Sequence, residues 1–312
     1  EAIDTGKGTL TVNANGTWSF VANANQDNTQ VSFTIRVTDG DKDVASDSLT
    51  ISITDGAGPS VTGPLALTVD EEALGNANAT GTNPGSNAEI DNTGNTLTFT
   101  AGSDAIDSIV FGATGGISIS GLDETQTVVW TASVDGRTLT GKVGSVDAIK
   151  LELAGATTVA AGGNGNVTVT ATLLDNFLHQ DNVNVNSLTI SGVQVVGADD
   201  DGDSATALVS VAVEDDLPTV SVSDTPASVV EGQSINGTWT QNAGADGGVT
   251  KVIVGATEYN VGDVIDTGKG ILTVGNSTWS FTAANNLDND TAQQVSFTIR
   301  VTDGDKDVAS DS

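Results

Sequence analysis

The stretch VSFTIRVTDGDKDVASDS, at Val31–Ser48, decides the fold of this chain of 312 residues. Its first half alternates apolar and polar residues with the period of two that indicates a half-buried β-strand. An Asp-Gly-Asp turn ends this strand, and a second strand follows the turn. The same eighteen residues return at Val295–Ser312. The sequence therefore predicts the same strand–turn–strand unit twice.

Other motifs return at nearly the same distance, about 262 residues along the chain. DTGKG at Asp4–Gly8 returns at Asp266–Gly270, and TWSF at Thr17–Phe20 returns at Thr278–Phe281. This identity indicates tandem duplication, which is more typical of stacked spacer units than of enzymes. Each terminal piece contains strands that the other lacks, so we expect an unpaired sheet edge that strand donation between molecules could fill.

The composition favours small β-sandwiches. Apolar residues make up 37% of the chain but aromatic residues only 4%, and 37 residues are glycine. Thin cores of Val, Ile, Leu, Ala and Thr suit two packed sheets better than a large enzyme core. Short alternating runs bounded by Gly, Asn and Asp recur along the chain, and no stretch has helical periodicity. We expect an all-β chain of tandem immunoglobulin-like β-sandwich domains joined by short acidic linkers.

Two linkers divide the chain. TDGAGPSV at Thr54–Val61 and VEDDLPTV at Val213–Val220 each follow a strand, carry acids and place a proline before the next strand. Proline removes a hydrogen-bond donor and stiffens the connection. The expected domains are 1–57, the C-terminal part of one domain; 58–216, a complete and longer domain; and 217–312, a second copy of the first type without its last strand.

The net charge limits the partners. Asp and Glu number 41 and Lys and Arg number 10, which gives −31. Such a chain repels nucleic acid and anionic membranes, and no apolar run is long enough for membrane insertion of this segment. It attracts hard divalent cations, which prefer oxygen ligands. The alternative is that the acids form a solubilising coat. The chain has no cysteine, so disulfides and thiolate metal sites are excluded.

Three acidic turns share one design, a strand followed by an Asp/Gly turn and a final strand. They are TDGDKDVAS at Thr38–Ser46, ADDDGDSAT at Ala198–Thr206 and TDGDKDVAS at Thr302–Ser310. Alternate aspartates in such a turn can converge on one cation while glycine lets the backbone fold around it. An EF-hand is excluded because its twelfth position, which should be Glu, would be Thr50. The three occurrences predict Ca²⁺, and the alternative is a tight polar hairpin turn.

Sandwich topology places each final turn against the linker that precedes its domain. Eight acids would then meet at the second junction, where bound Ca²⁺ would offset their repulsion. The alternative is that these acids stay solvated and splay apart. They are Glu71, Glu72, Glu214, Asp215, Asp216, Asp303, Asp305 and Asp307. The first junction would combine Asp55, Asp199, Asp200, Asp201 and Asp203. Asp39, Asp41 and Asp43 would face a domain before this sequence, and Glu231 one after it.

Catalytic constellations are scarce. The single histidine, His179, is expected to be an exposed residue at a strand end, and no cysteine is present. Nucleophile–base pairs are therefore scarce, and we expect no enzyme. Trp18, Trp239 and Trp279 lie within predicted strands and are expected in the cores.

The pattern VTDGDKDVASDSLTISITDGAGP and its variant ADDDGDSATALVSVAVEDDLP resemble the tandem immunoglobulin-like extender repeats of bacterial RTX adhesins. These are large type I secreted adhesion proteins of biofilms. The resemblance implies a cadherin-like stalk on an outer-membrane-anchored protein, outside the cell and at its surface. It also implies that Ca²⁺ at the linkers stiffens neighbouring repeats of the same chain, which are its expected partners. The alternative is a ligand-binding module for a glycan, ice or a partner adhesin.

Overall fold

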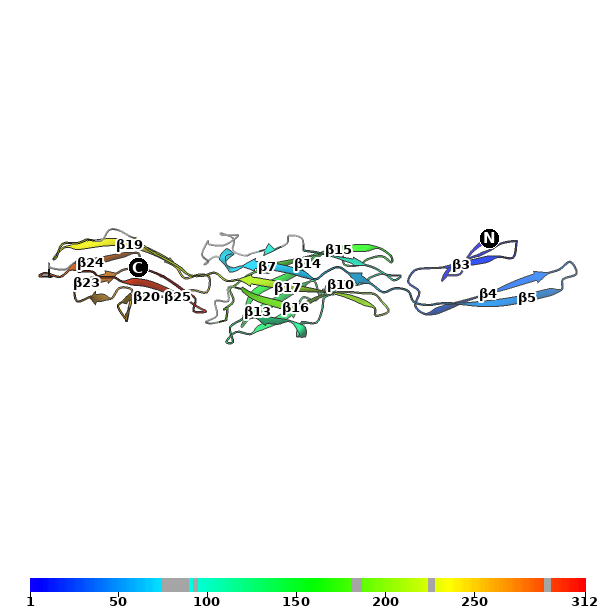
Figure 1. Cartoon of the computed structure of the whole chain (residues 1–312). Helices are drawn as coiled ribbons and strands as arrows, with labels where there is room; N and C mark the ends of the chain where they lie inside the picture. The colour runs from blue at the N-terminus through cyan, green and yellow to red at the C-terminus, as the bar shows by residue number, and fades with distance from the viewer. Residues whose placement is uncertain (75–89, 92–94, 181–186, 224–227, 289–292) are drawn as a thin grey trace.

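The chain is all-β, as predicted, and its strands form three groups along one line (Figure 1). The computed structural model describes residues 1–74, 90–91, 95–180, 187–223, 228–288 and 293–312. Within these ranges, the helical elements are two single 3₁₀ turns, η1 (Glu71–Ala73) and η2 (Thr114–Gly116). None of the described helices has the length and apolarity needed to cross a membrane.

The first group comprises two small sheets built from residues 1–54. One sheet has the order β1 (Ala2–Asp4), β2 (Gly8–Val12), β3 (Trp18–Ala22). The other pairs β4 (Thr29–Thr38) with β5 (Val44–Ile53) in one antiparallel register from Thr29↔Ile53 to Thr38↔Val44. The predicted strand–turn–strand unit is confirmed here.

The second group is a sandwich of two larger sheets. The first sheet has the order β10-β16-β17-β7, with β11 also paired to β16. Its strands are β7 (Leu65–Asp70), β10 (Ser108–Phe111), β11 (Ser118–Ser120), β16 (Ser187–Ala198) and β17 (Ser204–Glu214). The second sheet has the order β12-β13-β14-β15-β9-β6, with β8 also paired to β15. Its strands are β6 (Ser60–Val61), β8 (Ile90–Asp91), β9 (Thr96–Thr100), β12 (Val128–Ala132), β13 (Thr138–Val143), β14 (Val146–Gly155) and β15 (Asn164–Leu173).

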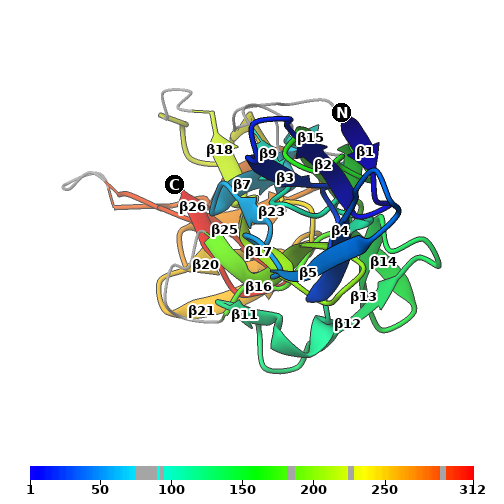
Figure 2. The same cartoon turned by 90° about the vertical axis from the view of Figure 1, so that its right-hand side faces the viewer.

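The third group is a smaller sandwich. Its first sheet has the order β18 (Thr219–Val222), β19 (Ser234–Asn242), β24 (Thr278–Ala283), β23 (Gly270–Val274), β22 (Val264–Asp266). Its second sheet has the order β21 (Thr257–Asn260), β20 (Gly248–Val254), β25 (Thr298–Asp303), β26 (Val308–Asp311). The view along the long axis shows β25, β26 and β20 of the third group behind β16 and β17 of the second (Figure 2).

The second and third groups each enclose their own apolar cluster. Phe99, Phe177 and Leu151, all fully buried, belong to the second group's core. Trp239 and Trp279 lie in the third group's core, where 3% and 8% of their surfaces remain exposed. Alternation along the strands produces both cores, because every second side chain of a strand points to the same face.

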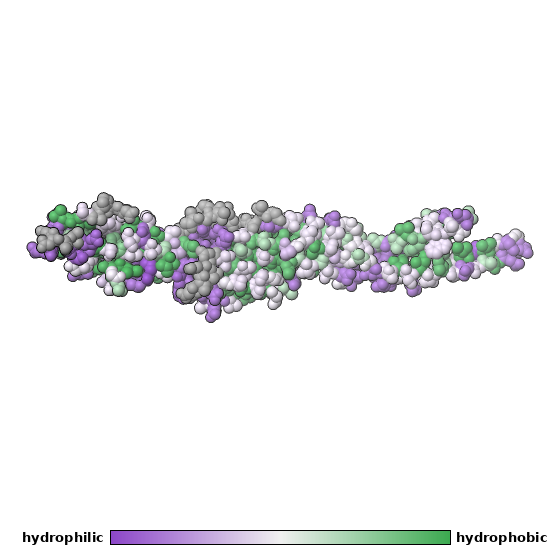
Figure 3. Space-filling model, viewed as in Figure 1, coloured by the Kyte–Doolittle hydropathy of each residue, from purple (hydrophilic) through white to green (hydrophobic). Residues whose placement is uncertain are grey.

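The motifs that the first and third groups share are less buried in the first group. Trp18, the counterpart of Trp279, is 44% exposed, and Val37 is 64% exposed whereas its counterpart Val301 is fully buried. In the third group β19 pairs with β24 and β20 with β25, but β3 and β4 have no such partner strands within residues 1–54. The prediction that Trp18 is a core residue is therefore wrong. Figure 3 shows apolar residues at the surface of this group. Strand donation to these edges stays a prediction.

Candidate metal centre

The second linker, Glu214–Pro218, leaves the sheet beside η1. Strands β17 and β7 run parallel, with Glu214 opposite Asp70 in the register. The residues that follow each strand therefore emerge at the same edge of the sheet. Glu71 and Asp215 follow these two strands, and 1% and 8% of their surfaces are exposed. Parallel pairing thus brings together two acids that are far apart in the sequence.

The turn between β25 and β26 forms the other side of this junction. The Asp303 backbone N–H donates to the carbonyl oxygen of Asp307 at 3.1 Å. Lys306 occupies the left-handed region at φ 83°, which closes the turn. Asp303 and Asp305 are only 6% and 5% exposed. The predicted turn residues therefore lie at the buried interface of the two strand groups.

A loop between β19 and β20 adds a further carboxylate. Strand β20 pairs with β25 so that Gly248 lies opposite Asp303. The preceding loop consequently reaches the turn, and the Asp305 N–H donates to Asp246 Oδ2 at 3.0 Å. Asp246 was not among the predicted site residues.

Three trios of potential ligand atoms gather at this junction, each with its atoms within 4.8 Å of one another. The two oxygen-only trios are Asp246–Asp303–Asp305 and Asp215–Asp305–Asp307. The third is Glu71–His179–Asp215. Asp215 and Asp305 each belong to two trios, so the three form one continuous cluster, which we call the junction cluster.

The junction cluster is strongly perturbed by its own burial. Burial and the neighbouring Asp305 raise the pKa of Asp303 to about 9, and burial raises the pKa of Asp215 to about 8. Burial also raises the pKa of Glu71 to about 7 and that of Asp246 to about 6. Desolvation and like charges both disfavour the ionised form. Without a cation, the ionised forms of these carboxylates repel one another.

Several carboxylate oxygens at this junction have no hydrogen-bond donor in the described part of the chain. They are both oxygens of Asp303, Oδ1 of Asp305 and Oδ2 of Asp215. A buried polar atom without a partner costs about 1–3 kcal/mol, and more when it is charged. Divalent cations at the two oxygen-only trios would supply partners for carboxylates of all three residues.

His179 occupies a different place from the predicted one. It is 1% exposed, so the expectation of an exposed strand-end residue is wrong. Its imidazole Nε2 lies 3.7 Å from Glu71 Oε1, and its backbone N–H donates to Asp305 Oδ2 at 3.2 Å. The segment after β15 thus crosses the junction and contacts the acidic turn of the third group.

Junction 1, around the linker Asp55–Pro59, is more open. Asp55 is half-buried, while Asp200, Asp201 and Asp203 are exposed. The Asp203 carboxylate lies against Gly58 of the linker. Asp199 is half-buried, and burial and Asp201 raise its pKa. These residues are brought to one junction, but they do not converge as closely as the junction cluster.

Asp104 is a buried acid at junction 1 that was not among the predicted site residues. It is 4% exposed, and its Oδ1 has no donor among the described residues. Burial raises its pKa, and Asp55 and Asp201 raise it further. Asp27, from the connection between β3 and β4, faces the same acids, and its pKa is also raised.

A repeated sequence motif contains both Asp104 and Asp246 and could have predicted them as site residues. AGSD at Ala101–Asp104 and AGAD at Ala243–Asp246 occupy the loop before β10 and the loop before β20. A Cβ at Gly102 would lie 1.6 Å from the carbonyl oxygen of Ala57, and one at Gly244 would lie 2.4 Å from that of Asp216. Glycine therefore lets each loop pack against its linker and bring its aspartate to the junction.

The remaining predicted residues lie outside the close trios of this junction. Glu214 is exposed, Glu72 is half-buried in η1, and Asp216 is 1% exposed in the linker. Asp39, Asp41 and Asp43 are exposed, although one oxygen from each lies within 4.8 Å of the others. Glu231 is exposed and accepts a hydrogen bond from the Leu287 N–H at 2.9 Å.

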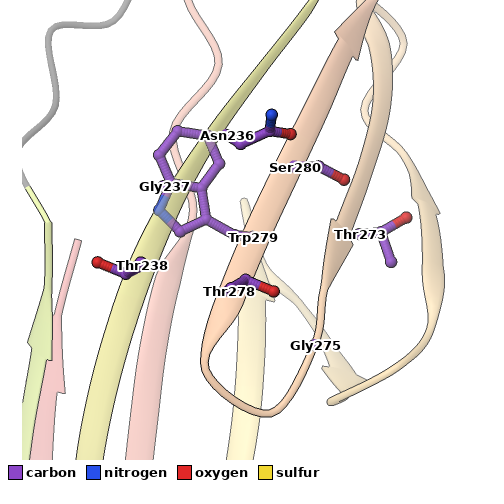
Figure 4. A pocket seen from close by; sticks show the side chains of 8 residues that line it. All are labelled: Asn236, Gly237, Thr238, Thr273, Gly275, Thr278, Trp279 and Ser280. Atoms are coloured by element: carbon purple, nitrogen blue, oxygen red, sulfur yellow. The ribbon is translucent and has the colours of Figure 1, made fainter.

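A groove on the third group offers little to a ligand. It has a volume of about 510 Å³ and lies over β19, β23 and β24, where Asn236, Thr238 and Trp279 contribute to its lining (Figure 4). Trp279 is 8% exposed and packs edge-on against Phe297 at 5.4 Å between ring centroids. Its ring is therefore part of the core and no open stacking platform.

Comparison with known proteins identifies one segment. Residues 1–54 match the family model of the bacterial Ig domain. No curated protein matches the chain. The match covers the first strand group, which carries the repeated strand–turn–strand unit.

Solved structures of similar architecture include cadherin and adhesin repeats. Mouse clustered PcdhgC3 EC1-3 is 11% identical, with 96% of this chain and 83% of that chain covered and a TM-score of 0.28. A tetra-tandem repeat in the extending region of a large adhesion protein is 16% identical, with 97% and 85% covered and a TM-score of 0.19. Superpositions this loose align no individual residues, so the fold assignment rests on the strands and registers described above.

Proposed function

We propose that this chain is an extender segment of a bacterial cell-surface adhesin, in which Ca²⁺ bound at the junctions stiffens a row of sandwiches. In this proposal the segment lies outside the cell and carries a distal ligand-binding region away from an outer-membrane anchor. The predicted domain cuts after residues 57 and 216 are part of the proposal. The sequence resemblance to RTX adhesins of biofilms and the bacterial Ig match at residues 1–54 support it.

The observation that carries the proposal is the state of Asp303. Its carboxylate is 6% exposed, neither oxygen meets a donor in the described structure, and Asp246 and Asp305 lie beside it. Three converging carboxylates with no cationic side chain among them are the ligand chemistry that Ca²⁺ prefers. Ca²⁺ would join the turn of the third group to the linker through Asp215 and would so restrain the hinge.

Stiffness gives the segment its mechanical purpose. The three strand groups already lie in a row (Figure 1), and rigid connections make the reach of such a row proportional to the number of units. Flexible connections let the reach grow only with the square root of length. Removing Ca²⁺ would restore carboxylate repulsion at the junction and free the hinge.

Small-angle X-ray scattering with Ca²⁺ and with a chelator tests the proposal. We expect a longer maximum dimension and a higher Tm with Ca²⁺. Asp305→Asn should abolish both differences, whereas Asp41→Asn should preserve them. The second variant is a matched control because Asp41 occupies the same position in an identical but exposed turn. Equal dimensions and equal Tm in both conditions would overturn the calcium-stiffened stalk.

A further inference from the structure

We propose that Glu71, His179 and Asp215 form a second cation site at the same junction, and that it takes a transition-metal ion such as Zn²⁺ instead of Ca²⁺. The atoms that these residues offer lie within 4.8 Å of one another. The proposal does not depend on calcium at the oxygen-only trios, because it concerns a different set of ligand atoms that includes a nitrogen.

The contacts that hold the backbone around His179 in place include hydrogen bonds donated by four successive N–H groups. Phe177 is fully buried in the core of the second group, and its N–H donates to Glu71 Oε1 at 2.7 Å. The Leu178 N–H donates to Gln126 Oε1 at 2.9 Å, and the Gln180 N–H donates to the carbonyl oxygen of Gly121 at 2.8 Å. The fourth contact is from the His179 N–H to Asp305 Oδ2. The imidazole is therefore carried by a fixed segment.

The separation between the imidazole and Glu71 suits a shared ion. His179 Nε2 and Glu71 Oε1 are 3.7 Å apart, which is longer than an ordinary hydrogen bond. Two ligands about 2.0–2.2 Å from one tetrahedral Zn²⁺ are separated by about 3.4 Å. A small shift of either side chain would therefore place both atoms on one ion.

Asp215 independently offers a buried carboxylate oxygen to the same site. Its side chain is 8% exposed, and its Oδ2 is buried without a hydrogen-bond donor in the described residues. Glu71 and His179 are each 1% exposed. As metal ligands, the two ionised carboxylates and the neutral imidazole would carry a charge of −2, which a divalent ion would cancel. Without such an ion, burying these charged groups away from water costs folding free energy.

Ligand type separates this site from its neighbours. Ca²⁺ takes oxygen ligands, as the Asp246–Asp303–Asp305 trio provides. Imidazole nitrogen suits Zn²⁺, Ni²⁺ or Cu²⁺. One junction would thus hold two kinds of ion, and Asp215, which belongs to trios of both kinds, would couple their occupancy.

The presence of a single histidine makes the test direct. The imidazole of a tag-free, ¹⁵N-labelled protein is followed by NMR while ZnCl₂ is added to the full chain. We expect the ring nitrogen signals to change until about one equivalent has bound. A saturating addition of Ca²⁺ alone should not produce the nitrogen shift of a metal-bound imidazole. Unchanged ring nitrogen signals at saturating Zn²⁺ would overturn the proposal.

Two variants divide the sites by calorimetric titration. His179→Gln should weaken Zn²⁺ binding at least tenfold and leave Ca²⁺ binding within about threefold. Asp246→Asn, which spares all three residues of the histidine site, should do the opposite. Wild-type Zn²⁺ affinity in His179→Gln, with a Tm in chelator matching that of the wild type, would contradict the site. If that variant fails to fold, the wild-type imidazole signals still decide. Calcium-dependent scattering without any Zn²⁺ response would remove this site and retain the calcium proposal.

Discussion

Junction 1, around Asp55–Pro59, and junction 2, around Glu214–Pro218, are built on the same plan, but only junction 2 buries the acids of its turn and its linker. In both, the first residue of the acidic turn donates its N–H to the carbonyl oxygen of the fifth at 3.1 Å, from Asp199 to Asp203 and from Asp303 to Asp307. In both, an A-G-x-D loop packs against the linker. Yet Asp303 is 6% exposed, whereas Asp201 and Asp203 of the other turn are exposed.

The linkers account for this difference. Aligned on Pro59 and Pro218, linker 2 has Asp215–Asp216 where linker 1 has Gly56–Ala57. A Cβ at Gly56 would lie 2.2 Å from Ser103 Oγ, so no larger residue fits there without movement. Junction 1 is joined by direct hydrogen bonds, such as that from the Ala105 N–H to Asn25 Oδ1 at 2.9 Å. Linker 2 therefore adds two buried acids to its junction at positions where linker 1 has none.

The identical turns at 39–43 and 303–307 give a second comparison. The Asp39 pKa is lowered, because Asp41 and the backbone N–H groups of the turn hydrogen-bond its carboxylate. Burial raises the pKa of Asp303 to about 9. The pKa of the first aspartate in this turn thus shifts in opposite directions in the two copies, and the neighbouring strand group supplies the difference.

The substitution Asp303→Asn should have the largest effect on stability, and the sign of that effect depends on whether Ca²⁺ is present. With Ca²⁺ at about 100 times its Kd, bound calcium contributes about 2.7 kcal/mol of stability, most of which the variant should lose. In chelator the same variant should raise the Tm near neutral pH, because it removes a buried carboxyl that must take up a proton when the protein folds. Scanning calorimetry in both conditions measures this reversal.

Asp199→Asn at the equivalent position of junction 1 is the control. It should change the Tm in the same directions but by less than half as much, because Asp199 is only half-buried. Equal effects of the two substitutions would show that the linker does not set the difference between the junctions.

Removing calcium should also give junction 2 an unusual pH dependence. A carboxyl whose pKa is raised in the folded state stabilises the protein fully below its unfolded pKa, here 3.8 for Asp303, and loses that contribution as the pH rises through about 9. In chelator the Tm should therefore fall as the pH rises from about 4 to 9. With Ca²⁺ the fall should shrink or reverse, because metal binding requires ionised ligands. A Tm in chelator that rises steadily over this range would contradict the buried cluster.

Sequence patterns predicted the strands and the meeting of distant acids well. Strict alternation at 31–38 and the identical turns at 39–43 and 303–307 predicted the final hairpins. Sandwich topology predicted that Asp215 lies beside Asp305 and Asp307. The trio of these three residues lies within 4.8 Å. Topology sufficed because parallel β7 and β17 carry their following residues to one edge.

Burial of individual side chains was harder to predict. Trp18 and Trp279 share the motif TWSF, yet 44% and 8% of their surfaces are exposed, because only Trp279 has partner strands over it. His179 follows no strand pattern, and its burial depends on hydrogen bonds to Gln126 and Asp305 by residues 178 and 179. Such contacts between distant loops leave no periodic signal in the sequence. The A-G-x-D repeat was visible, and it would have found Asp104 and Asp246.

Replacing linker 2 by the residues of linker 1 tests the comparison directly. The double variant Asp215→Gly, Asp216→Ala should lower calcium affinity at junction 2 by about tenfold, or about 1.4 kcal/mol, because the Asp215–Asp305–Asp307 trio loses a ligand. Calorimetric titration measures the affinity. The variant should still keep the Asp246–Asp303–Asp305 trio, so complete loss of binding would mean that the linker supplies more than one ligand. Unchanged affinity would mean that it supplies none.

The smallest expected effect belongs to Asp104→Asn at junction 1. Asp104 Oδ2 accepts a hydrogen bond from Ser103 Oγ at 3.1 Å, which an amide oxygen can also accept. Burial and Asp55 raise the pKa of Asp104, so the substitution should raise stability slightly in chelator, within about 0.5 kcal/mol. If Ca²⁺ binds junction 1 as tightly as junction 2, the variant should instead lower the Tm with Ca²⁺ as much as Asp246→Asn does. That outcome would show that the exposed acids of turn 199–203 close around an ion although linker 1 has glycine at position 56. The two junctions would then differ in the burial of their acids only when calcium is absent.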